Sequence, residues 1–401
     1  MNSTRPLNIL INGWYGQRNA GDDAILDVFA EQTAQRFDAQ IDVLSELPHN
    51  IAPTARMRGL PHPVFYGRNA LRQLLNGDSF RHIKEVRKAD LVVVGGGGLL
   101  RDNTNWRNLL RLLDEIWLAR LFGRKTMLYA IGIGPFRTAL GKWLIAQTVR
   151  RCDLVTVRSE RCAALLREIG VAPERIHVVA DPAFLFTPQV PTEPGIRALF
   201  GSGKKKVGFY PAWSLQNFPG AIEQVAAALD RLVELEGVEI VSVPMAVLAR
   251  GKDDVEIGRR VRAAMRHPEA LHLYEERLSA AELKWVTGQA VLNICVRLHA
   301  MIFSLGCHVP VVPINYEPKV RAVFDDFDAP EYLVDIDATL SERLVESSQR
   351  CLRNLDAYAA HIRERHACVV PLSTRTFNLM QELFPSTQPQ RLATGKGENA
   401  V

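Results

Sequence analysis

Several features that would assign a chain to a special class are missing from this sequence. No apolar run reaches the roughly 18 residues that a membrane-spanning helix requires. The apolar stretch 109–121 is interrupted by charged residues at helical spacing, which predicts an amphipathic helix packed on a sheet. The polar start, residues 1–7, has none of the features of a secretory signal. We therefore expect a cytoplasmic protein.

Cysteine is scarce, and its spacing does not favour a metal site. The six cysteines form no Cys-x-x-Cys pair, so a zinc site is not expected. Reduced thiols are the default in a long chain without a secretory signal. Cys295 lies near the candidate site described below, and we interpret it as a small buried hydrophobic side chain. We predict neither a metal nor a cofactor.

A strong positive charge is absent as well. The net charge is +5 over 401 residues, and the longest basic run is 204–206. Such a modest excess fits an anionic small molecule or a membrane surface as well as nucleic acid. No nucleic-acid-binding motif accompanies it, so we expect no nucleic-acid partner. The motifs Gly-x-Gly-x-x-Gly and Gly-x-x-x-x-Gly-Lys-Ser/Thr are missing too, and with them the signatures of dinucleotide and P-loop sites.

What the sequence does contain is a regular alternation of short apolar runs and helical patterns. Runs rich in β-branched residues, such as 91–94 and 154–157, alternate with helical stretches in both halves of the chain. This alternation predicts right-handed βαβ units and parallel sheets. The run 91–94 is continuously apolar, as expected for a strand covered on both faces. Near the C-terminus we expect one long helix over 340–367 and another around 374–383.

Closely spaced prolines separate two alternating regions. Pro182, Pro188, Pro191 and Pro194 indicate a linker or a domain boundary. We therefore predict an α/β protein with two Rossmann-like, doubly wound domains that face a cleft. The N-terminal domain covers 1–187, the C-terminal domain with its final helices covers 188–385, and 386–401 form a disordered tail.

A glycine-rich loop joins the first expected strand to the first helix. The loop 13–22 reads GWYGQRNAGD, and its glycines allow positive φ and close approach of the backbone to a ligand. The helix that follows presents free N–H groups at its start. Tyr15, Asn19 and Asp22 are predicted to face the cleft. The alternative is that Asp22 or Asp23 caps the helix.

Four consecutive glycines, 95–98, follow the buried run 91–94. Because each glycine costs conformational entropy on folding, such a run indicates close approach of the backbone to a ligand or to a neighbouring helix. We therefore predict that Gly96, Gly97, Arg101 and Asp102 belong to the cleft loops. Packing without a ligand is the alternative.

An arginine and a histidine, Arg297 and His299, follow the expected strand 291–294. In an open parallel sheet, ligands bind outside the carboxyl ends of the strands. A guanidinium holds an anion with a planar fork of donors, and an imidazole can move a proton near neutral pH. The pair predicts anion capture coupled to proton transfer, with both residues catalytic. A satisfied core histidine is the alternative for His299.

Two further charged residues follow strand ends in the first half of the chain. Arg158 comes after 154–157 and is expected to point into the same crevice, unless it is solvated or paired with a glutamate. Ser159 is expected to cap the next helix. Asp181 could cap, accept a hydrogen bond or act as a base.

Six motifs occur in a fixed order between about Asn8 and Val323. They are GWYGxxNAGDDAIL, VVGGGGLLRD, YAIGIGP, TVRSE, ADPAF and VRLHAMIF followed by VPVVPINYEPKV. Together they resemble the polysaccharide pyruvyl transferases, a family related to the bacterial cell-wall ketal-forming enzymes. No single motif is decisive, but the ordered set is specific.

The resemblance implies a GT-B-like fold and a transfer reaction. Pyruvate would pass from phosphoenolpyruvate, a co-substrate, to two hydroxyls of a sugar in a cell-surface glycan precursor, giving a cyclic ketal and free phosphate. By the matching motifs, Arg297, Leu298 and His299 of the C-terminal domain would hold the donor, with Arg158 as the second arginine. Apart from the motif match, Lys319 could add charge near the phosphate, with an ordinary surface lysine as the alternative. The N-terminal domain would form the acceptor side.

These residue types suit that chemistry. Phosphoenolpyruvate carries a phosphate and a carboxylate, so two separated guanidinium groups would neutralise and orient it. Ketal formation needs a proton on the methylene carbon, attack on C2 by a sugar hydroxyl, and loss of phosphate. His299 could supply that proton or relay one from the hydroxyl.

The sequence departs from the family pattern at two places, which leaves altered activity open. The segment 209–214 stands where many relatives carry an arginine, and Glu317 stands where aspartate is common. A nucleotide-sugar-dependent GT-B glycosyltransferase, with Glu317 holding the ribose, is the alternative function, and a non-catalytic glycan-binding relative is another. The resemblance implies a glycan or lipid-linked saccharide as the acceptor. It leaves open peripheral contact with the inner membrane face and a homo-oligomer.

Overall fold

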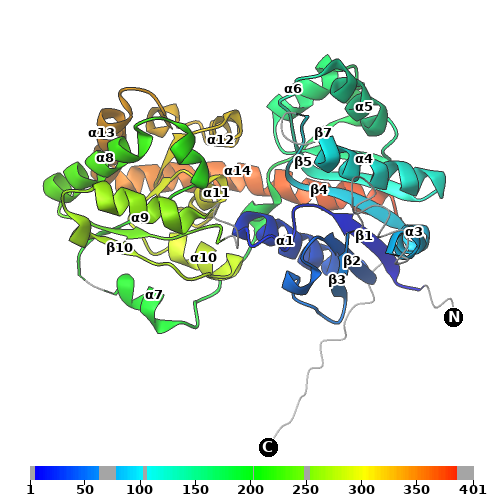
Figure 1. Cartoon of the computed structure of the whole chain (residues 1–401), viewed down its shortest axis with the longest axis horizontal. Helices are drawn as coiled ribbons and strands as arrows, with labels where there is room; N and C mark the ends of the chain where they lie inside the picture. The colour runs from blue at the N-terminus through cyan, green and yellow to red at the C-terminus, as the bar shows by residue number, and fades with distance from the viewer. Residues whose placement is uncertain (1–4, 63–77, 103–105, 202, 248–252, 386–401) are drawn as a thin grey trace, which may run out of the picture.

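Two α/β domains lie side by side in the computed structural model, which describes residues 5–62, 78–102, 106–201, 203–247 and 253–385 (Figure 1). Each domain is built on one parallel sheet. The N-terminal sheet has seven strands in the order β3-β2-β1-β4-β5-β6-β7, and the C-terminal sheet has six in the order β10-β9-β8-β11-β12-β13. The expected class, two Rossmann-like doubly wound domains, is confirmed.

The strands alternate with helices along the described chain. The N-terminal strands are β1 (Leu7–Asn12), β2 (Ala39–Ser45), β3 (Met57–Pro61), β4 (Leu91–Leu100), β5 (Lys125–Ile133), β6 (Leu154–Val157) and β7 (His177–Val178). The C-terminal strands are β8 (Lys206–Tyr210), β9 (Glu239–Ser242), β10 (Leu271–Leu273), β11 (Leu292–Cys295), β12 (Val311–Asn315) and β13 (Val334–Asp335).

The helices cover both faces of each sheet. In the N-terminal domain they are α1 (Ala20–Arg36), α3 (Asp78–Lys88), α4 (Trp106–Leu121), α5 (Ala139–Val149) and α6 (Glu160–Glu168). After the change of domain they are α7 (Pro194–Leu199), α8 (Ala221–Glu236), α9 (Asp254–Ala264), α10 (Ala280–Thr287), α11 (Leu298–Gly306), α12 (Pro318–Phe324), α13 (Leu340–Arg353) and α14 (Leu355–Glu382).

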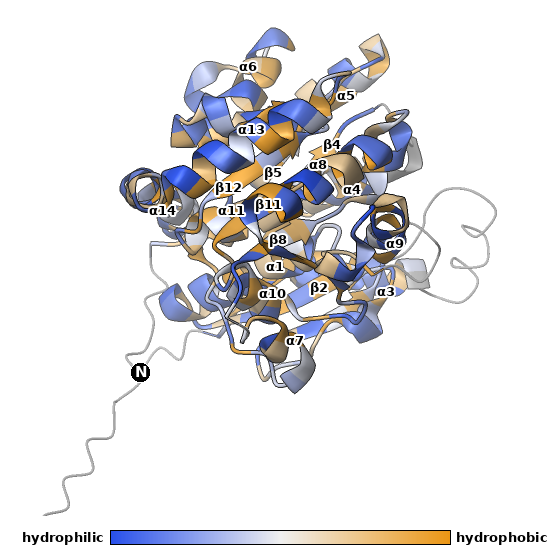
Figure 2. Ribbon diagram, turned by 90° about the vertical axis from the view of Figure 1, so that its left-hand side faces the viewer, coloured by the Kyte–Doolittle hydropathy of each residue, from blue (hydrophilic) through white to orange (hydrophobic). Residues whose placement is uncertain are grey.

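Hydropathy explains this layering. The central strands are largely hydrophobic, whereas the helices carry hydrophilic residues on their outer faces (Figure 2). All five residues of β8 and all four of β6 are buried. Parallel strands are shielded on both faces by their crossover helices, so their sequences read as continuous apolar runs. The carboxyl ends of both sets of strands open toward the space between the domains, where ligands of such folds bind.

Strand β4 is longer than the apolar run 91–94 predicts, because it continues through the four glycines to Leu100. Gly95 pairs with Tyr129 of β5 and Gly97 with Ile131, and the register shifts between Gly97 and Leu100. A Cβ on Gly95 would overlap the backbone of Tyr129, so this glycine permits close contact between strands.

The C-terminal helices divide at a different place from the one predicted. The first helix ends at Arg353, because the Asn354 side chain donates to the Arg350 carbonyl at 2.8 Å and competes with the next helical turn. Helix α14 then continues through Pro371, across the gap 368–373 that was predicted between two helices. The carbonyl that loses its helical donor to Pro371 belongs to Ala367, an exposed residue that water can reach.

Helix α14 ties the two domains together. Near its start, Tyr358 donates to the Val311 carbonyl of β12 at 3.1 Å. Nearer its end, Phe377 packs in the N-terminal domain against Phe29 and Tyr129, with ring centroids 6.3 and 5.8 Å apart. The change of sheet falls between β7 and β8, and the final helix returns to the N-terminal domain. The expected tail 386–401 lies outside the described residues.

Candidate functional site

A cavity of about 770 Å³ lies between the domains at the carboxyl ends of the two sheets. The N-terminal domain contributes the β1–α1 loop and the ends of β4, β5 and β6, and the C-terminal domain contributes the ends of β11 and β12. Among the expected site residues, the cavity lining includes Asn19, Asp22, Gly97, Arg101, Arg158, Arg297, Leu298, His299 and Lys319. Residues that are far apart in the sequence therefore meet in one space.

Arg297 is held by a carboxylate that sequence reasoning missed. Its Nε and Nη2 donate to the two oxygens of Asp254 at 2.8 and 2.6 Å. Asp254 is fully buried and also accepts from the backbone N–H groups of Trp213 and Ala246. The only sequence signal for this role was an acidic pair at a helix start, which is typical of capping. Within the described residues no bond engages Nη1 of Arg297, so this group is free to meet an anion.

Arg158 approaches from the opposite domain. It is 4% exposed, and its Nη1 donates to Oδ2 of Asp181 at 3.1 Å. Arg158 lines the cavity, and its partner is a buried aspartate, neither water nor a glutamate as in the alternative. Gly132 makes room for this side chain, since an added Cβ would come within 3.0 Å of Nη2. Asp181 also accepts from the N–H of Ala183, so it both caps the short 3₁₀ helix Pro182–Leu185 and fixes the guanidinium.

His299, in the first turn of α11, shares Asp181 with Arg158. Its Nε2 lies 3.9 Å from Oδ2 of Asp181, which is too far for a hydrogen bond, and it has no hydrogen-bond partner among the described residues. Burial lowers the pKa of His299 to about 4, and the positive charges of Arg158, Lys319 and Arg297 act in the same direction. The imidazole is therefore neutral at pH 7 and faces a cavity with an unpartnered nitrogen.

Asp22 carries the opposite perturbation. Burial and the nearby Asp23 raise its pKa to about 7, although Arg158 and the other cations of the site oppose this. The Asn19 side chain donates to Asp22 at 2.6 Å, and the Asn19 oxygen also accepts from the N–H of Gly21. Asn19 is thus the cap of α1, which leaves Asp22 available to the cavity. Asp23 instead accepts from the Gly16 N–H and pairs with Arg277.

Lys319 lies in the first turn of α12 and has two close neighbours, the carboxylate of Glu317 and the ring of Tyr316. Its Nζ is 2.5 Å from Oε2 of Glu317 and 5.1 Å from the ring centroid of Tyr316. Burial would lower the pKa of Lys319, but Tyr316 and Glu317 outweigh it and raise that pKa, so the amine stays charged. Glu317 forms an ion pair with this lysine.

Three of the expected cleft residues do not line the cavity. Tyr15 is fully buried, and its hydroxyl donates to the Gly95 carbonyl at 2.8 Å. Gly96 adopts a φ of +76° beneath that phenol ring. Asp102 accepts from the N–H groups of Arg137 and Thr138 just before α5. These residues shape the loops, while Asn19, Asp22, Gly97 and Arg101 form their cavity side.

The segment 209–214, which departs from the family pattern, supports Arg297 from below. The Tyr210 carbonyl accepts from the N–H groups of Val296 and Arg297 at 3.0 and 3.3 Å, and the N–H of Trp213 donates to Asp254.

All six cysteines are free, and Cys295 is buried. In the part of the chain that the structure describes, no three His, Cys, Asp or Glu side chains are grouped so that they could hold a metal ion. Among the described residues, no helix is both long enough and apolar enough to span a membrane.

The fold resembles that of GT-B enzymes. A glycosyltransferase from Rickettsia africae is similar, with a TM-score of 0.62 and 11% identity over 95% of this chain and 97% of that one. The Anabaena protein Alr3699/HepE, in complex with UDP and glucose, gives a TM-score of 0.61 and 12% identity over 95% of this chain and 100% of that one. These likenesses establish a two-domain, Rossmann-like GT-B fold.

The family follows from the sequence match. The model of the polysaccharide pyruvyl transferase family matches residues 19–318, and the chain belongs to this family. The amylovoran biosynthesis protein AmsJ of Erwinia amylovora is 20% identical over 393 residues, which span 87% of this chain and 93% of AmsJ. The matched range contains Arg158, Arg297 and His299 of the cavity and ends one residue before Lys319.

Proposed function

We propose that this protein transfers pyruvate from phosphoenolpyruvate to two hydroxyls of a sugar in a polysaccharide precursor, forming a cyclic ketal and releasing phosphate. The observation that carries the proposal is the convergence of Arg158, Arg297 and Lys319 on one cavity beside a neutral imidazole. A donor with one phosphate and one carboxylate needs separated cations of this kind. The family and the polysaccharide-related homologue support the same reaction class.

The donor is bound by cations whose positions are fixed before it arrives. Arg297 is clamped by Asp254 and Arg158 by Asp181, so neither guanidinium has to be ordered on binding. Lys319 adds a third positive charge. Together they would stabilise the negative charge that develops on the departing phosphate in a site partly shielded from water.

The acid and base roles follow from the opposite pKa shifts of two cavity residues. Asp22, with a pKa raised to about 7, still carries a proton near neutrality, and it would protonate the methylene carbon of phosphoenolpyruvate. His299, with a pKa lowered to about 4, is neutral and would accept the proton of the attacking hydroxyl. Of the two roles that the sequence left open for His299, supplying the proton or relaying one from the hydroxyl, the proposal takes the second.

The steps balance in atoms and charge. Proton transfer to the methylene carbon makes C2 electrophilic, and the first sugar hydroxyl forms a C2–O bond as its proton passes to His299. The C2–O bond to phosphate then breaks, and the second hydroxyl closes the ketal. One hydroxyl proton restores the acid Asp22 and the other leaves with phosphate.

The test is a transfer assay with phosphoenolpyruvate and a candidate glycan, read as phosphate release and as ketal in the product. His299→Gln and Arg297→Lys should each lower phosphate release at least tenfold while the thermal unfolding temperature is preserved. Full activity in both variants would remove the site assignment. UDP-glucose in the same assay tests the glycosyltransferase alternative, which the fold neighbours alone favour.

A further inference from the structure

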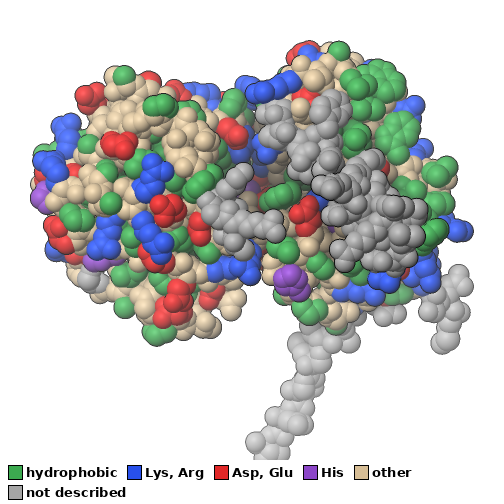
Figure 3. All heavy atoms as spheres, in the orientation of Figure 1, with side chains coloured by type: hydrophobic (Ala, Val, Ile, Leu, Met, Phe, Trp, Pro, Cys, Tyr) green, Lys and Arg blue, Asp and Glu red, His purple; other side chains and the backbone are tan. Residues whose placement is uncertain are grey.

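Exposed apolar side chains gather on two neighbouring helices of the N-terminal domain. Among the described residues, the exposed large hydrophobic side chains include Trp117 and Leu121 on α4 and Leu140 and Trp143 on α5, with 39, 76, 58 and 57% of their surface exposed. Figure 3 shows hydrophobic side chains collected over this part of the molecule, at the upper right. We call these four residues the α4–α5 patch.

Gln147 and Arg151 connect the two halves of the patch. Trp117 and Leu121 are four residues apart and Leu140 and Trp143 three, so each pair lies on one helix face. One helical turn beyond Trp143, Gln147 accepts from Arg151 through its carbonyl and its side chain, at 2.7 and 2.8 Å. The Arg151 guanidinium then stacks on the Trp117 ring, 4.6 Å from its centroid.

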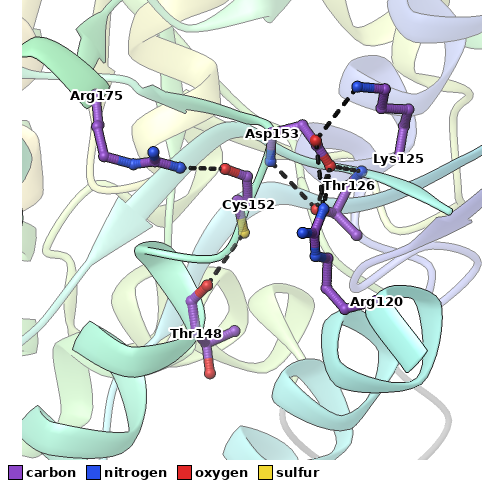
Figure 4. A network of polar contacts seen from close by, with 7 residues as sticks. All are labelled: Arg120, Lys125, Thr126, Thr148, Cys152, Asp153 and Arg175. Atoms are coloured by element: carbon purple, nitrogen blue, oxygen red, sulfur yellow. Dashed lines mark hydrogen bonds and ion pairs between the residues drawn. The ribbon is translucent and has the colours of Figure 1, made fainter. Parts of the chain in front are cut away.

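The patch is also held in place. The Trp117 indole N–H donates to Oγ1 of Thr148 at 2.9 Å, which joins α4 to α5. Beneath it, Asp153 binds Arg120, Lys125 and Thr126, and the Cys152 thiol donates to the Thr148 carbonyl (Figure 4). Ordered aromatic side chains lose little further freedom when they are covered by another surface.

Positive charge surrounds the patch. Arg137, Arg150 and Arg151 are exposed next to it, and within the described residues none of them pairs with a carboxylate. The nearby acids are already neutralised, because Asp153 binds Arg120 and Lys125, and Glu168 binds Lys142. An apolar centre with tryptophan and an arginine rim is complementary to an anionic lipid surface.

We propose that the α4–α5 patch docks this protein on an anionic phospholipid bilayer. Trp143 and Leu140 enter the boundary between head groups and acyl chains, and the rim arginines meet the phosphates. A symmetric contact with a second copy of the chain is disfavoured, because it would bring the two arginine rims together. That contact is an outcome of the test.

The α4–α5 patch lies beside the cavity, so docking would bring the cavity close to the membrane surface. Lys142 lies between Leu140 and Trp143 in α5, and it lines the cavity together with Phe136. A sugar attached to a membrane lipid would therefore reach the cavity from the docked face. This route to the cavity rests on the proposed function, whereas the docking itself does not.

The experiment is co-sedimentation of the full chain with vesicles of phosphatidylglycerol and phosphatidylethanolamine, compared with vesicles of phosphatidylcholine alone. The double variant Leu140→Ser/Trp143→Ser tests the apolar centre, and Arg150→Glu/Arg151→Gln tests the rim. The control is Leu235→Ser/Leu372→Ser, which removes two exposed leucines, 55 and 41% exposed, from other helices. Circular dichroism checks that all variants are folded.

We expect the bound fraction of the unaltered protein to be at least tenfold higher on anionic vesicles. Both patch variants should lose this binding at least tenfold, and the leucine control should keep it. The proposal would be overturned if the unaltered protein did not bind anionic vesicles, or if the patch variants bound them equally well. It would also be overturned if the protein formed a dimer that Leu140→Ser/Trp143→Ser abolished and bound no vesicles. Phosphate release with a water-soluble acceptor should be the same in the Leu140→Ser/Trp143→Ser variant as in the unaltered protein. If the unaltered protein binds vesicles but releases no phosphate, the proposed function is overturned and the docking proposal stands.

Discussion

Gly21 of α1 lies directly against the imidazole of His299 on α11, so the two domains touch at the centre of the candidate site. A Cβ added to Gly21 would overlap Nδ1 of that ring. Close by, the Ala20 N–H donates to the Met245 carbonyl at 3.0 Å, and Asn19 forms an antiparallel bridge with Ala246. The N-terminal domain therefore sets the position of a histidine that belongs to the C-terminal domain.

Gly21→Ala should displace His299 or separate the domains. Alanine improves helix propensity by about 1 kcal/mol, so the fold should survive. We expect kcat/KM for phosphate release to fall about 100-fold, because a displacement of roughly 1 Å at a reacting group has effects of this size. Gly203→Ala is the matched control, since an added Cβ there meets nothing within 4 Å. Unchanged kinetics in Gly21→Ala would show that the contact is irrelevant to turnover.

The pH dependence should follow Asp22. An acid must be protonated to act, and a raised pKa of about 7 means that kcat/KM falls as pH rises above about 7. His299 imposes no loss until pH approaches about 4, because it acts in its neutral form. Asp22→Asn should lower the rate and remove the alkaline decline in the remaining activity. Asp23→Asn should retain that decline, and a decline that persists in Asp22→Asn would assign the proton to another group.

The Arg297–Asp254 pair should matter for both stability and donor binding. Asp254→Asn removes the fully buried counter-charge of Arg297, whose side chain is 22% exposed, and should lower the free energy of unfolding by about 1.5–3 kcal/mol. It should also raise KM for phosphoenolpyruvate more than it lowers kcat, because Arg297 loses its orientation. Asp42→Asn breaks a pair of the same geometry, in which the Arg58 side chain is 61% exposed, and should cost about 1 kcal/mol or less. Urea unfolding separates the two, and equal losses would contradict this account.

Phe377 should anchor α14 to the N-terminal domain. Phe377→Ala removes a fully buried ring that packs on Phe29 and Tyr129, so the free energy of unfolding should drop by about 3–5 kcal/mol. Phe80, 65% exposed, is the matched control, and Phe80→Ala should change this free energy by about 0.5 kcal/mol or less. If both substitutions cost the same, the helix is not held by this contact.

The sequence predicted the sheets better than the edges and ends of elements. Apolar runs such as 154–157 became strands because shielding on both faces requires a continuous apolar run. The edge strand Met57–Pro61 escaped notice because glycine and proline interrupt its pattern, and an edge strand tolerates both. Glycines 95–98 looked like a loop, but they extend β4, since Gly95 brings the backbone close to Tyr129.

The sequence identified the charged residues of the candidate site but not the residues that pair with them. Arg158, Arg297 and His299 stood out because each follows a strand end, where a parallel sheet binds ligands. Asp254 did not, because it lies 43 residues before Arg297 and resembles a helix cap. Tyr15 was expected in the cleft because it lies in the glycine-rich loop before the first helix, but its ring is buried in the core against Gly96. Tertiary packing within each domain decides both cases, because Tyr15 contacts Gly95 in the N-terminal domain and Asp254 pairs with Arg297 in the C-terminal domain.

The central claim is tested most directly by the product of a reaction with phosphoenolpyruvate and the polysaccharide precursor. Mass spectrometry and NMR of the glycan should reveal one pyruvyl ketal for each phosphate released, and the ketal should be lost in His299→Gln and Arg158→Lys. Phosphate released without a ketal, or a sugar transferred from UDP-glucose instead, would contradict the account.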